Sequence, residues 1–268
     1  MKTVLVISSF VAASRVGATA SAFCLRRLGH DAIILPTTLM GRHPGWGHPG
    51  GGATDVETLA EMWAAIKDQN IQIDAVLSGY MGDTAHILFA AEVIRDVKAA
   101  NPDAMILVDP VMGDHGRLYI PEARAQLIAE TLLPLADIIT PNQWEWEYMT
   151  KQIGAKISCN VLITSVEVGE AIGAQYIGQN LNMQVSHPKF DAVPHGGGDA
   201  LAGLFLGHSL NGKDAVTAMG QAVAGVFKIM EAANKYDAGE LPLIRTQEAW
   251  VTPFPLATHD LKDDTSDD

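Results

Sequence analysis

The sequence has 268 residues, of which 48% are hydrophobic and 18% are charged. A chain of this length can bury a full core, and no apolar run reaches the roughly 18 to 20 residues that a membrane-spanning helix needs. The formal net charge of -13 argues against a nucleic-acid partner, because binding to a phosphate backbone requires clustered Lys and Arg. The two cysteines, Cys24 and Cys159, are too few for a disulfide framework or a cysteine-rich metal site.

Strand-like apolar runs alternate with helix-like periodic segments along most of the chain. The runs predict strands at 3–9, 32–35, 75–77, 105–108, 138–139 and 161–163, and the periodic segments predict helices at 17–28, 55–68, 84–99, 199–209 and 214–232. This alternation is typical of the α/β class, with a mostly parallel central sheet and helices on both of its faces. We expect residues 1–258 to form one such domain.

The two ends of the sequence differ in character. Met1-Lys2-Thr3 precedes an apolar run and has neither the charged leader nor the small-residue cleavage site of a secretion signal, which predicts a cytoplasmic protein. Residues 259–268 are acidic and contain little apolar surface, so we expect a disordered tail there.

Two segments do not fit regular structure. Residues 40–53 are too rich in Gly and Pro for a helix or strand, and we interpret this long loop as a lid. Its Trp46 could cover a flat ligand or could have a packing role. Residues 151–160 lie where the alternation predicts a crossover helix between parallel strands, but they leave little room for one.

The lid contains a literal G-x-G-x-x-G pattern at residues 45–50, which raises the question of a dinucleotide-binding fold. Pro49 removes one backbone N–H from a loop that would hold the pyrophosphate, and no acidic residue ends a following strand at the position that contacts a ribose. We therefore reject this interpretation. The lid histidines His43 and His48 lack the cluster of partners that would indicate a metal site.

The strongest local signal is the run His195-Gly196-Gly197-Gly198-Asp199, which is followed directly by a helical segment. Three glycines allow the backbone to approach a ligand closely, and the first turn of a helix presents unpaired N–H groups to an anion. The run therefore predicts an anion hole formed by Gly196, Gly197 and Gly198. Asp199 could be a catalytic carboxylate or only the N-cap of the helix.

Polar residues also follow two of the predicted strands. Asp109 and Asp114 come after the strand at 105–108, and Asn142 and Glu145 follow the strand at 138–139. Ligands of open α/β sheets bind at the carboxyl ends of the strands. Two carboxylates at that edge suit a magnesium nucleotide, although each acidic residue taken alone could be a solvated cap.

Together these motifs resemble the ribokinase-like superfamily, and within it the vitamin B6 branch that includes the pyridoxal kinases. The resemblance covers nearly the whole chain and is carried by residues 6–9, 26–29, 77–82, 109–114, 116–119, 140–145, 162–165 and 196–199. Asp109-Pro110-Val111-Met112-Gly113-Asp114 with Leu118-Tyr119 soon after it is fairly specific to this branch. The resemblance implies a ribokinase-like fold, a homodimer and an ATP-dependent kinase that phosphorylates the 5′-hydroxymethyl group of pyridoxal, pyridoxine or pyridoxamine.

The resemblance also implies roles for residues on the substrate side. Ser9 would contact the pyridine ring and Tyr80 would line its pocket, while Pro44 and Gly45 stand at the lid position that meets the substrate. Asp199 would take the hydroxyl proton. Because Asp199 lies at a helix N-terminus, we expect it to be ionised at neutral pH and to be a weak base.

On the nucleotide side, the resemblance implies that the amides of the glycine run bind the migrating phosphate and that Asp109 and Glu145 hold Mg²⁺. The residues that would serve ATP are Asp109, Thr140, Asn142, Glu145 and Thr164.

Several departures from the family pattern cluster around the ring pocket. Gly197 stands where the family usually has Thr, Phe10 and Arg15 stand where many relatives carry histidines, and Pro44-Gly45 replaces a frequent Thr. The segment 151–160 is also shorter than the family pattern by about one helix. These changes keep three alternatives open: a hydroxymethylpyrimidine kinase, a non-catalytic B6-binding protein and a sugar kinase.

Overall fold

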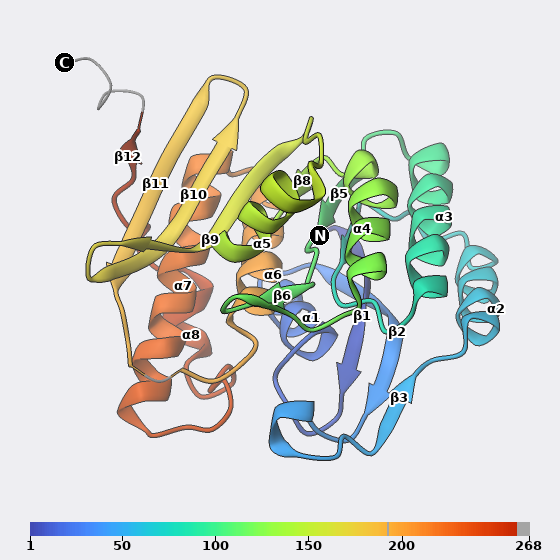
Figure 1. Ribbon diagram of the computed structural model, residues 1–268, viewed down its shortest axis with the longest axis horizontal. Coiled ribbons are helices and arrows are strands. Elements are labelled where there is room, and N and C mark those ends of the chain that lie inside the picture. The colour runs from blue at the N-terminus through green and yellow to red at the C-terminus, as the bar shows by residue number, and fades with distance from the viewer. Residues whose placement is uncertain (192, 262–268) are drawn as a thin grey trace.

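The computed structural model describes residues 1–191 and 193–261. The strands of its main sheet are β1 (Thr3–Val11), β2 (Asp31–Met40), β3 (Gly51–Ala53), β4 (Ala75–Ser78), β5 (Met105–Val108), β8 (Ile138–Ile139), β9 (Asn160–Val168), β10 (Ala171–Gly178), β11 (Leu181–Pro188) and β12 (His259–Asp260). Their order in the sheet is β12-β11-β10-β9-β8-β5-β4-β1-β2-β3 (Figure 1). The strands from β9 to β2 in this order pair in parallel, whereas β3 at one edge and β10, β11 and β12 at the other are antiparallel.

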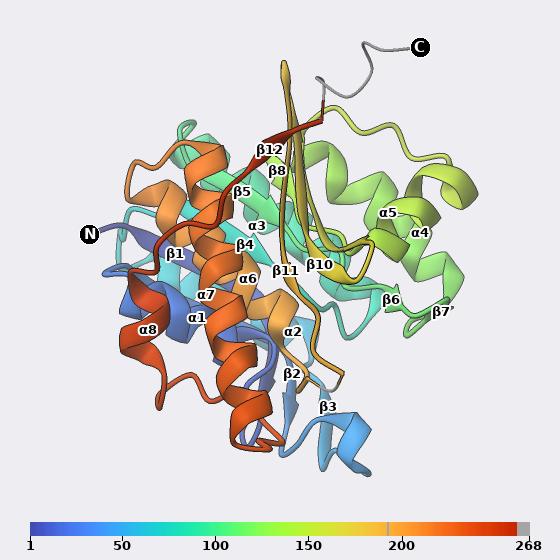
Figure 2. The same cartoon turned by 90° about the vertical axis from the view of Figure 1, so that its left-hand side faces the viewer.

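Helices cover both faces of this sheet. The helices are α1 (Ala18–Arg27), α2 (Val56–Lys67), α3 (Thr84–Ala100), α4 (Glu122–Thr131), α5 (Gln143–Glu147), α6 (Gly197–Leu210), α7 (Ala215–Lys235) and α8 (Gln247–Val251). One face carries α1, α6, α7 and α8, and the opposite face carries α2 to α5 (Figure 2). A separate hairpin of β6 (Gly113–Asp114) and β7 (Arg117–Leu118) lies beside α5.

The apolar run of β1 shows why the sequences of the central strands are continuously hydrophobic. Val4 and Val6 pack into the core on the side of α1, α6 and α7, and Leu5 and Ile7 pack into the core on the side of α2, α3 and α4. All four side chains are fully buried. A strand of a parallel sheet is buried on both faces, so alternate residues serve two cores. The expected α/β architecture, with a mostly parallel sheet between two helical layers, is confirmed.

The sequence prediction missed an antiparallel extension at one edge of the sheet. Only residues 161–163 were expected as a strand there, whereas β9, β10 and β11 form two consecutive hairpins. Their two-residue loops contain Gly169 and Asn180, both with positive φ, at 59° and 64°. Short loops of this kind are the usual hairpin signal, and they could have indicated the extension.

The crossover helix was expected within residues 151–160, but it lies earlier in the chain. It consists of α5 and a π-helical continuation, Tyr148–Ile153, which ends at Gly154 in the left-handed conformation. Pro141 stands just before this helix, whose N-cap is Asn142. The helix therefore fits between β8 and β9 because it begins directly after the first of these strands.

The lid and the tail are more ordered than the sequence suggested. Residues 40–53 include the end of β2, a 3-10 turn at Pro44–Trp46 and the edge strand β3, so the expectation of no regular structure is wrong there. β3 pairs with β2 from Thr38↔Ala53 to Met40↔Gly51. In the tail, His259 and Asp260 form β12 and pair with Gln184 and Met183, which contradicts disorder at these two positions. Residues 262–268 lie outside the described residues.

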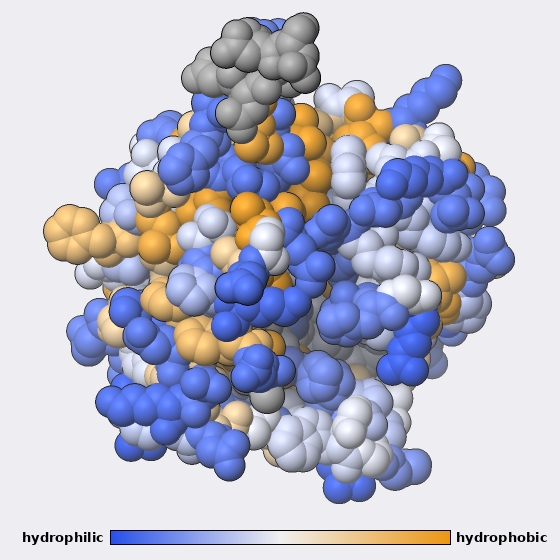
Figure 3. Space-filling view, turned by 60° about the vertical axis from the view of Figure 1, so that its left-hand side comes forward, coloured by the Kyte–Doolittle hydropathy of each residue, from blue (hydrophilic) through white to orange (hydrophobic). Residues whose placement is uncertain are grey.

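No helix within the described part of the chain is long and apolar enough to cross a membrane. Over the face that carries α7 and α8, hydrophobic side chains lie in small groups between hydrophilic ones (Figure 3).

Candidate active site

The glycine run forms the turn that opens α6. Gly196 is the N-cap residue, with φ 98° in the left-handed region, and a Cβ there would overlap the carbonyl oxygen of Arg15. Both the dihedral angle and the close approach require glycine. Asp199 is the third residue of the helix and not its cap, so the alternative that Asp199 is only an N-cap is wrong.

Asp199 lies deep among packed atoms, although part of its side-chain surface remains open. Burial raises the pKa of this carboxyl to about 6, and a hydrogen bond from the Gly17 amide opposes the shift. At pH 7 the group is still mostly ionised, as expected. The expectation of a weak base needs correction, because desolvation outweighs the helix N-terminus and makes Asp199 a stronger base than an ordinary Asp.

Gly17 connects Asp199 to the end of β1. The pairing of β1 with β2 is irregular at Ser9, between Ser8 and Phe10, and Ser9 is 6% exposed. A Cβ at Gly17 would overlap both the hydroxyl and the carbonyl oxygen of Ser9. The structure therefore brings the predicted ring-contact residue Ser9 and the predicted base Asp199 to opposite sides of one glycine.

Three acidic groups lie close together at the carboxyl ends of the strands. Burial, the charge of Glu145 and the charge of Asp199, in that order, raise the pKa of Asp109 well above its usual value. None of the largest influences on Asp109 is a Lys or Arg side chain. This arrangement of desolvated carboxylates favours a bound cation, which would lower the cost of ionising all three.

Glu145 joins two loops by hydrogen bonds to the backbone. Its Oε1 accepts from the amides of Met112 and Gly113, at 2.6 Å and 3.1 Å, and its Oε2 accepts from the amide of Asn142 at 2.9 Å. The side chain is 3% exposed, and burial raises its pKa to about 7. Glu145 thus holds the loop after β5 against the start of α5.

Asn142 belongs to the same contact between the loop after β5 and the start of α5, which we call the junction. Its side-chain oxygen accepts from the Glu145 amide at 2.8 Å, and its side-chain nitrogen donates to the carbonyl of Gly113 at 2.8 Å. Both polar groups of this side chain therefore bind the protein itself. The resemblance assigns Asn142 and Glu145 to the magnesium nucleotide, and in the structure both side chains fix backbone loops.

Thr164 lies next to this junction. The amide of Thr164 donates to the carbonyl of Pro141 at 2.8 Å, and Thr164 forms an isolated bridge with Asn142. The following residue, Ser165, has φ 54° and sits where the pairing of β9 with β10 is interrupted. Such a bulge bends the strand and changes the direction of the neighbouring side chains.

A large cavity of about 780 Å³ lies between this junction, the glycine run and the antiparallel strands. Of the predicted site residues, it is lined by Asn142, Thr164, Gly196, Gly197 and Gly198. Its other walls include an apolar strip of α7 and residues of β10, β11 and the segment after β11: Val223, Val226, Met230, Ile172, His187 and Phe190.

The sequence analysis did not predict these walls from α7, β10 and β11. Val223, Val226 and Met230 recur at helical spacing on one face of α7, but that pattern also describes an ordinary core-facing helix. Only the pairing of β10 with β11 shows that part of this face borders a cavity. The volume is sufficient for a nucleotide-sized ligand.

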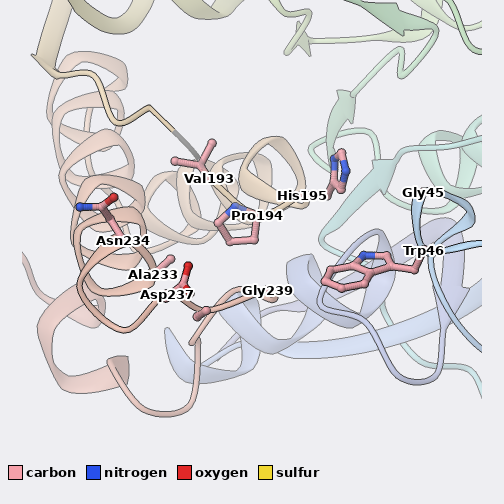
Figure 4. A pocket seen from close by; sticks show the side chains of 10 residues that line it. Gly45, Trp46, Val193, Pro194, His195, Ala233, Asn234, Asp237 and Gly239 are labelled. Atoms are coloured by element: carbon pink, nitrogen blue, oxygen red, sulfur yellow. The ribbon is translucent and has the colours of Figure 1, made fainter.

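A second cavity, of about 400 Å³, separates the lid from the C-terminal end of α7 (Figure 4). Gly45 and Trp46 line it from the lid, and Val193, Pro194 and His195 line it from the segment before the glycine run. The predicted site residues Pro44, Ser9, Tyr80, Asp109, Thr140, Glu145 and Asp199 line neither of these two cavities.

Tyr80 follows β4 where this strand pairs with β1, beside the strand end that carries Ser9. It is partly buried against the core formed by α2, α3 and α4, and its carbonyl accepts a hydrogen bond from the Thr37 hydroxyl at 2.6 Å. Thr140 is 4% exposed at the end of β8. Within the described residues, no group of three or more His, Cys, Asp or Glu side chains could hold a metal ion by itself.

The parallel sheet between helical layers, the glycine turn that opens α6 and the acidic junction at the strand ends together define a small-molecule kinase of the ribokinase-like class. Comparison with known proteins gives the family. A model described as phosphomethylpyrimidine kinase matches residues 50–243, and the chain belongs to this family and, within it, to the pyridoxal kinase group.

Two relatives and one solved structure illustrate the match. A pyridoxal kinase PdxY of Rubrobacter xylanophilus is 31% identical over 278 residues, covering 94% of this chain and 96% of that protein. A pyridoxal kinase PdxY of Corynebacterium diphtheriae is 32% identical over 274 residues, covering 93% and 96%. The pyridoxal kinase of Leishmania donovani in complex with ADP and pyridoxamine superposes with a TM-score of 0.89, at 21% identity over 97% of this chain. The expected ribokinase-like fold is confirmed.

Proposed function

We propose that this protein is an ATP-dependent kinase that phosphorylates the 5′-hydroxymethyl group of pyridoxal, and also of pyridoxine and pyridoxamine. The observation that carries the proposal is the placement of a buried carboxylate, Asp199, directly behind three glycines that border a nucleotide-sized cavity. The match to pyridoxal kinases over nearly the whole chain supports the choice of substrate.

Asp199 orients the accepting hydroxyl and takes its proton. Phosphoryl transfer passes through a loose transition state, so the protein mainly aligns the reactants and stabilises charge on the phosphate oxygens. A base with a pKa of about 6 remains largely ionised at neutral pH and still accepts a proton more readily than an ordinary Asp.

The amides of Gly196, Gly197 and Gly198 bind the migrating phosphate at the start of α6. Backbone donors at a helix N-terminus need no rearrangement when negative charge develops in front of them. Gly197 lacks the hydroxyl that a Thr would add, so binding at this position depends on the backbone alone.

Asp109 would hold Mg²⁺, with Glu145 as the second carboxylate of the site. The residues fit such an ion, because burial and the charges of Glu145 and Asp199 raise the cost of ionising Asp109, and the strongest influences on Asp109 include no cation. When bound, the ion neutralises charge on the phosphate oxygens. Glu145 and Asn142 also act through the backbone, since they fix the loop after β5 relative to α5.

The nucleotide would occupy the larger cavity, with Thr164 beside its phosphates and Thr140 at the neighbouring strand end. The vitamer would lie on the Ser9 side of Asp199, covered by the lid at Pro44 and Gly45, with Tyr80 as the outer wall of the ring pocket. A cytoplasmic location and a homodimer belong to the same proposal and rest on the resemblance.

A hydroxymethylpyrimidine kinase is the second candidate, because the matching family model carries a phosphomethylpyrimidine kinase description and the ring-side positions Phe10 and Arg15 are unusual for a pyridoxal kinase. An ADP-release assay over pyridoxal, pyridoxine, pyridoxamine, hydroxymethylpyrimidine and ribose separates these possibilities. We expect the largest kcat/KM with a vitamer. A larger value for the pyrimidine would overturn the proposal, and vitamer binding without ADP release would indicate a non-catalytic binding protein.

A further inference from the structure

The lid carries two histidines in nearly the same local setting, but only one of them contacts the body of the protein. The Nδ1 of His43 accepts a hydrogen bond from the Gly45 amide at 3.1 Å, and the Nδ1 of His48 accepts one from the Gly50 amide at 3.2 Å. The His48 side chain is exposed. The His43 ring stacks on the ring of His195, with the ring centroids 4.5 Å apart and the planes at 25°.

His195 is the residue that directly precedes the glycine run. Its ring and that of His43 both lie against Gly45, where a Cβ would come within 2.9 Å of His43 Nδ1 and 3.5 Å of His195 Nε2. Figure 4 shows His195 beside Gly45 and Trp46 of the lid in the wall of the smaller cavity. The stack therefore connects the tip of the lid to the turn that presents its amides to the phosphate.

A second route connects the same two elements through the segment after β1. The backbone amide of His43 donates to the hydroxyl of Ser14 at 3.2 Å, and Ser14 is 2% exposed. The next residue, Arg15, packs its carbonyl oxygen against Gly196. Two short chains of contacts thus connect the lid at His43 to the glycine run.

Trp46 makes a further contact between the lid and the body. Its ring lies over Gly239, where a Cβ would be only 2.7 Å from the indole, and the side chain is still 52% exposed. The base of the lid is held by backbone hydrogen bonds such as that from the Ala13 amide to the Gly41 carbonyl, whereas its tip rests on the body through ring contacts and the hydrogen bond to Ser14. Few contacts of this kind allow a segment to open and close.

We propose that His43 and His195 form a latch that couples closure of the lid to the position of the glycine run, which makes both histidines positioning residues for phosphoryl transfer. This inference rests on the proposed function. The closed latch holds Gly45 in place near the ring pocket and keeps water out while the phosphate moves.

The latch responds to pH through His43. Burial and the neighbouring His195 lower the pKa of His43, and the nearby Glu240 raises it. The charged groups around the pair are Glu240, which accepts a hydrogen bond from the Arg15 amide, Asp237 in the wall of the smaller cavity, and Arg42 on the lid. A proton taken up by His43 places positive charge in the partly buried stack, and the desolvation of this charge opposes closure.

The test measures kcat, the KM for the vitamer and the ratio of ADP released to vitamer phosphorylated, at pH 7.5. The variants are His43→Ala, His195→Ala, the double variant and His48→Ala as the matched lid control. We expect each latch variant to raise the KM about fivefold and to increase the excess of ADP, with kcat changed less. The double variant should be no worse than the single ones, and His48→Ala should match the unmodified protein.

His43→Phe provides a second readout that a purely structural role would not move. A phenyl ring retains stacking but cannot be protonated. Between pH 7.5 and pH 6 the vitamer KM of the unmodified protein should rise relative to that of His43→Phe. Protonation of Asp199 is common to both proteins and is therefore separated from the latch by this comparison.

Independent effects of the two alanine variants, an equal effect of His48→Ala, or the same rise in KM at pH 6 in His43→Phe would each overturn the latch. Failure of the proposed function gives a different result, since the unmodified protein would then phosphorylate no vitamer. The two failures are therefore distinguishable in one set of assays.

Discussion

The acidic junction at the strand ends and the lid are built in opposite ways. At the junction, Glu145 and Asn142 use all their side-chain polar groups to bind backbone atoms of the loop after β5 and the start of α5. The lid instead consists of glycines, prolines and exposed side chains around a 3-10 turn. One region is preformed by buried hydrogen bonds, and the tip of the other is held by a few ring contacts and one hydrogen bond.

The difference reflects the two tasks of the site. A buried carboxylate that accepts three amides positions the nucleotide side before any ligand arrives, which reduces the cost of ordering it later. The lid must admit one ligand and then exclude water, so strong contacts would slow its opening. Substitutions at the junction should therefore reduce stability, and substitutions in the lid should change the KM for the small substrate.

The loss of Asp199 should have the largest effect on the reaction. Asp199→Asn keeps the shape of the side chain but removes the proton acceptor, so we expect kcat to fall about 100- to 10,000-fold. The KM for ATP should stay within about threefold, because the substitution leaves the backbone amides in place. Steady-state kinetics with ATP and pyridoxal measure both values. A parallel loss of nucleotide binding would show that Asp199 is structural.

The pH dependence of the reaction gives a check on the same group. The pKa of Asp199 is raised to about 6. In the proposed mechanism its ionised form is the active one. The value of kcat/KM should therefore rise with pH through about 6 and fall as the pH drops below that value. A profile with its acid limb at pH 4, as for an exposed Asp, would contradict the burial of this carboxyl in the free enzyme.

Removal of Glu145 should cost the most stability. Glu145→Ala leaves the amides of Met112, Gly113 and Asn142 without their acceptor in a buried place, so we expect the free energy of unfolding to fall by about 3 kcal/mol. Urea unfolding measures the change. Glu147→Ala, on the same helix, removes only an exposed pair with Lys151 and should cost no more than about 0.5 kcal/mol. Equal losses in the two variants would refute the role of the junction.

The glycine run should show a smaller and position-specific effect. Gly196→Ala introduces a Cβ at a left-handed dihedral angle and against the Arg15 carbonyl, so we expect a loss of about 2 kcal/mol in the free energy of unfolding. At Gly198 a Cβ would have no neighbour within 4 Å, and Gly198→Ala should change stability by less than about 0.5 kcal/mol. Thermal unfolding of the two variants tests whether only the first glycine is required by the fold.

The smallest effect is expected from the contact of the lid with the body. Gly239→Ala would push the ring of Trp46 away, which should raise the KM for the vitamer about twofold and leave stability within about 0.5 kcal/mol. Gly52→Ala, in the edge strand of the lid, meets no atom within 4 Å and is the matched control. A loss of stability in Gly239→Ala larger than that in Glu145→Ala would reverse the contrast between the two regions.

The sequence predicted the parallel half of the fold well because burial on both faces leaves a continuous apolar run, as in Val4 to Ile7. It predicted the antiparallel half poorly, because β10 and β11 mix polar and apolar residues and contain glycines such as Gly173. That glycine is required by the close approach of the Val185 carbonyl, which only the pairing of the two strands creates. The apolar wall of the larger cavity could not be predicted for the same reason, because only the pairing of the strands creates it.

The linear sequence by itself determined the class of fold, the family and the positions of the polar residues, because strand ends, glycine runs and helix starts are local features. The tertiary structure alone decided which atoms those residues contact. It turned Glu145 and Asn142 toward the backbone, raised the pKa of Asp199 by burial and brought His43 onto His195, 152 positions away in the chain. Burial and long-range contact depend on how distant segments pack, and no short stretch of sequence encodes them.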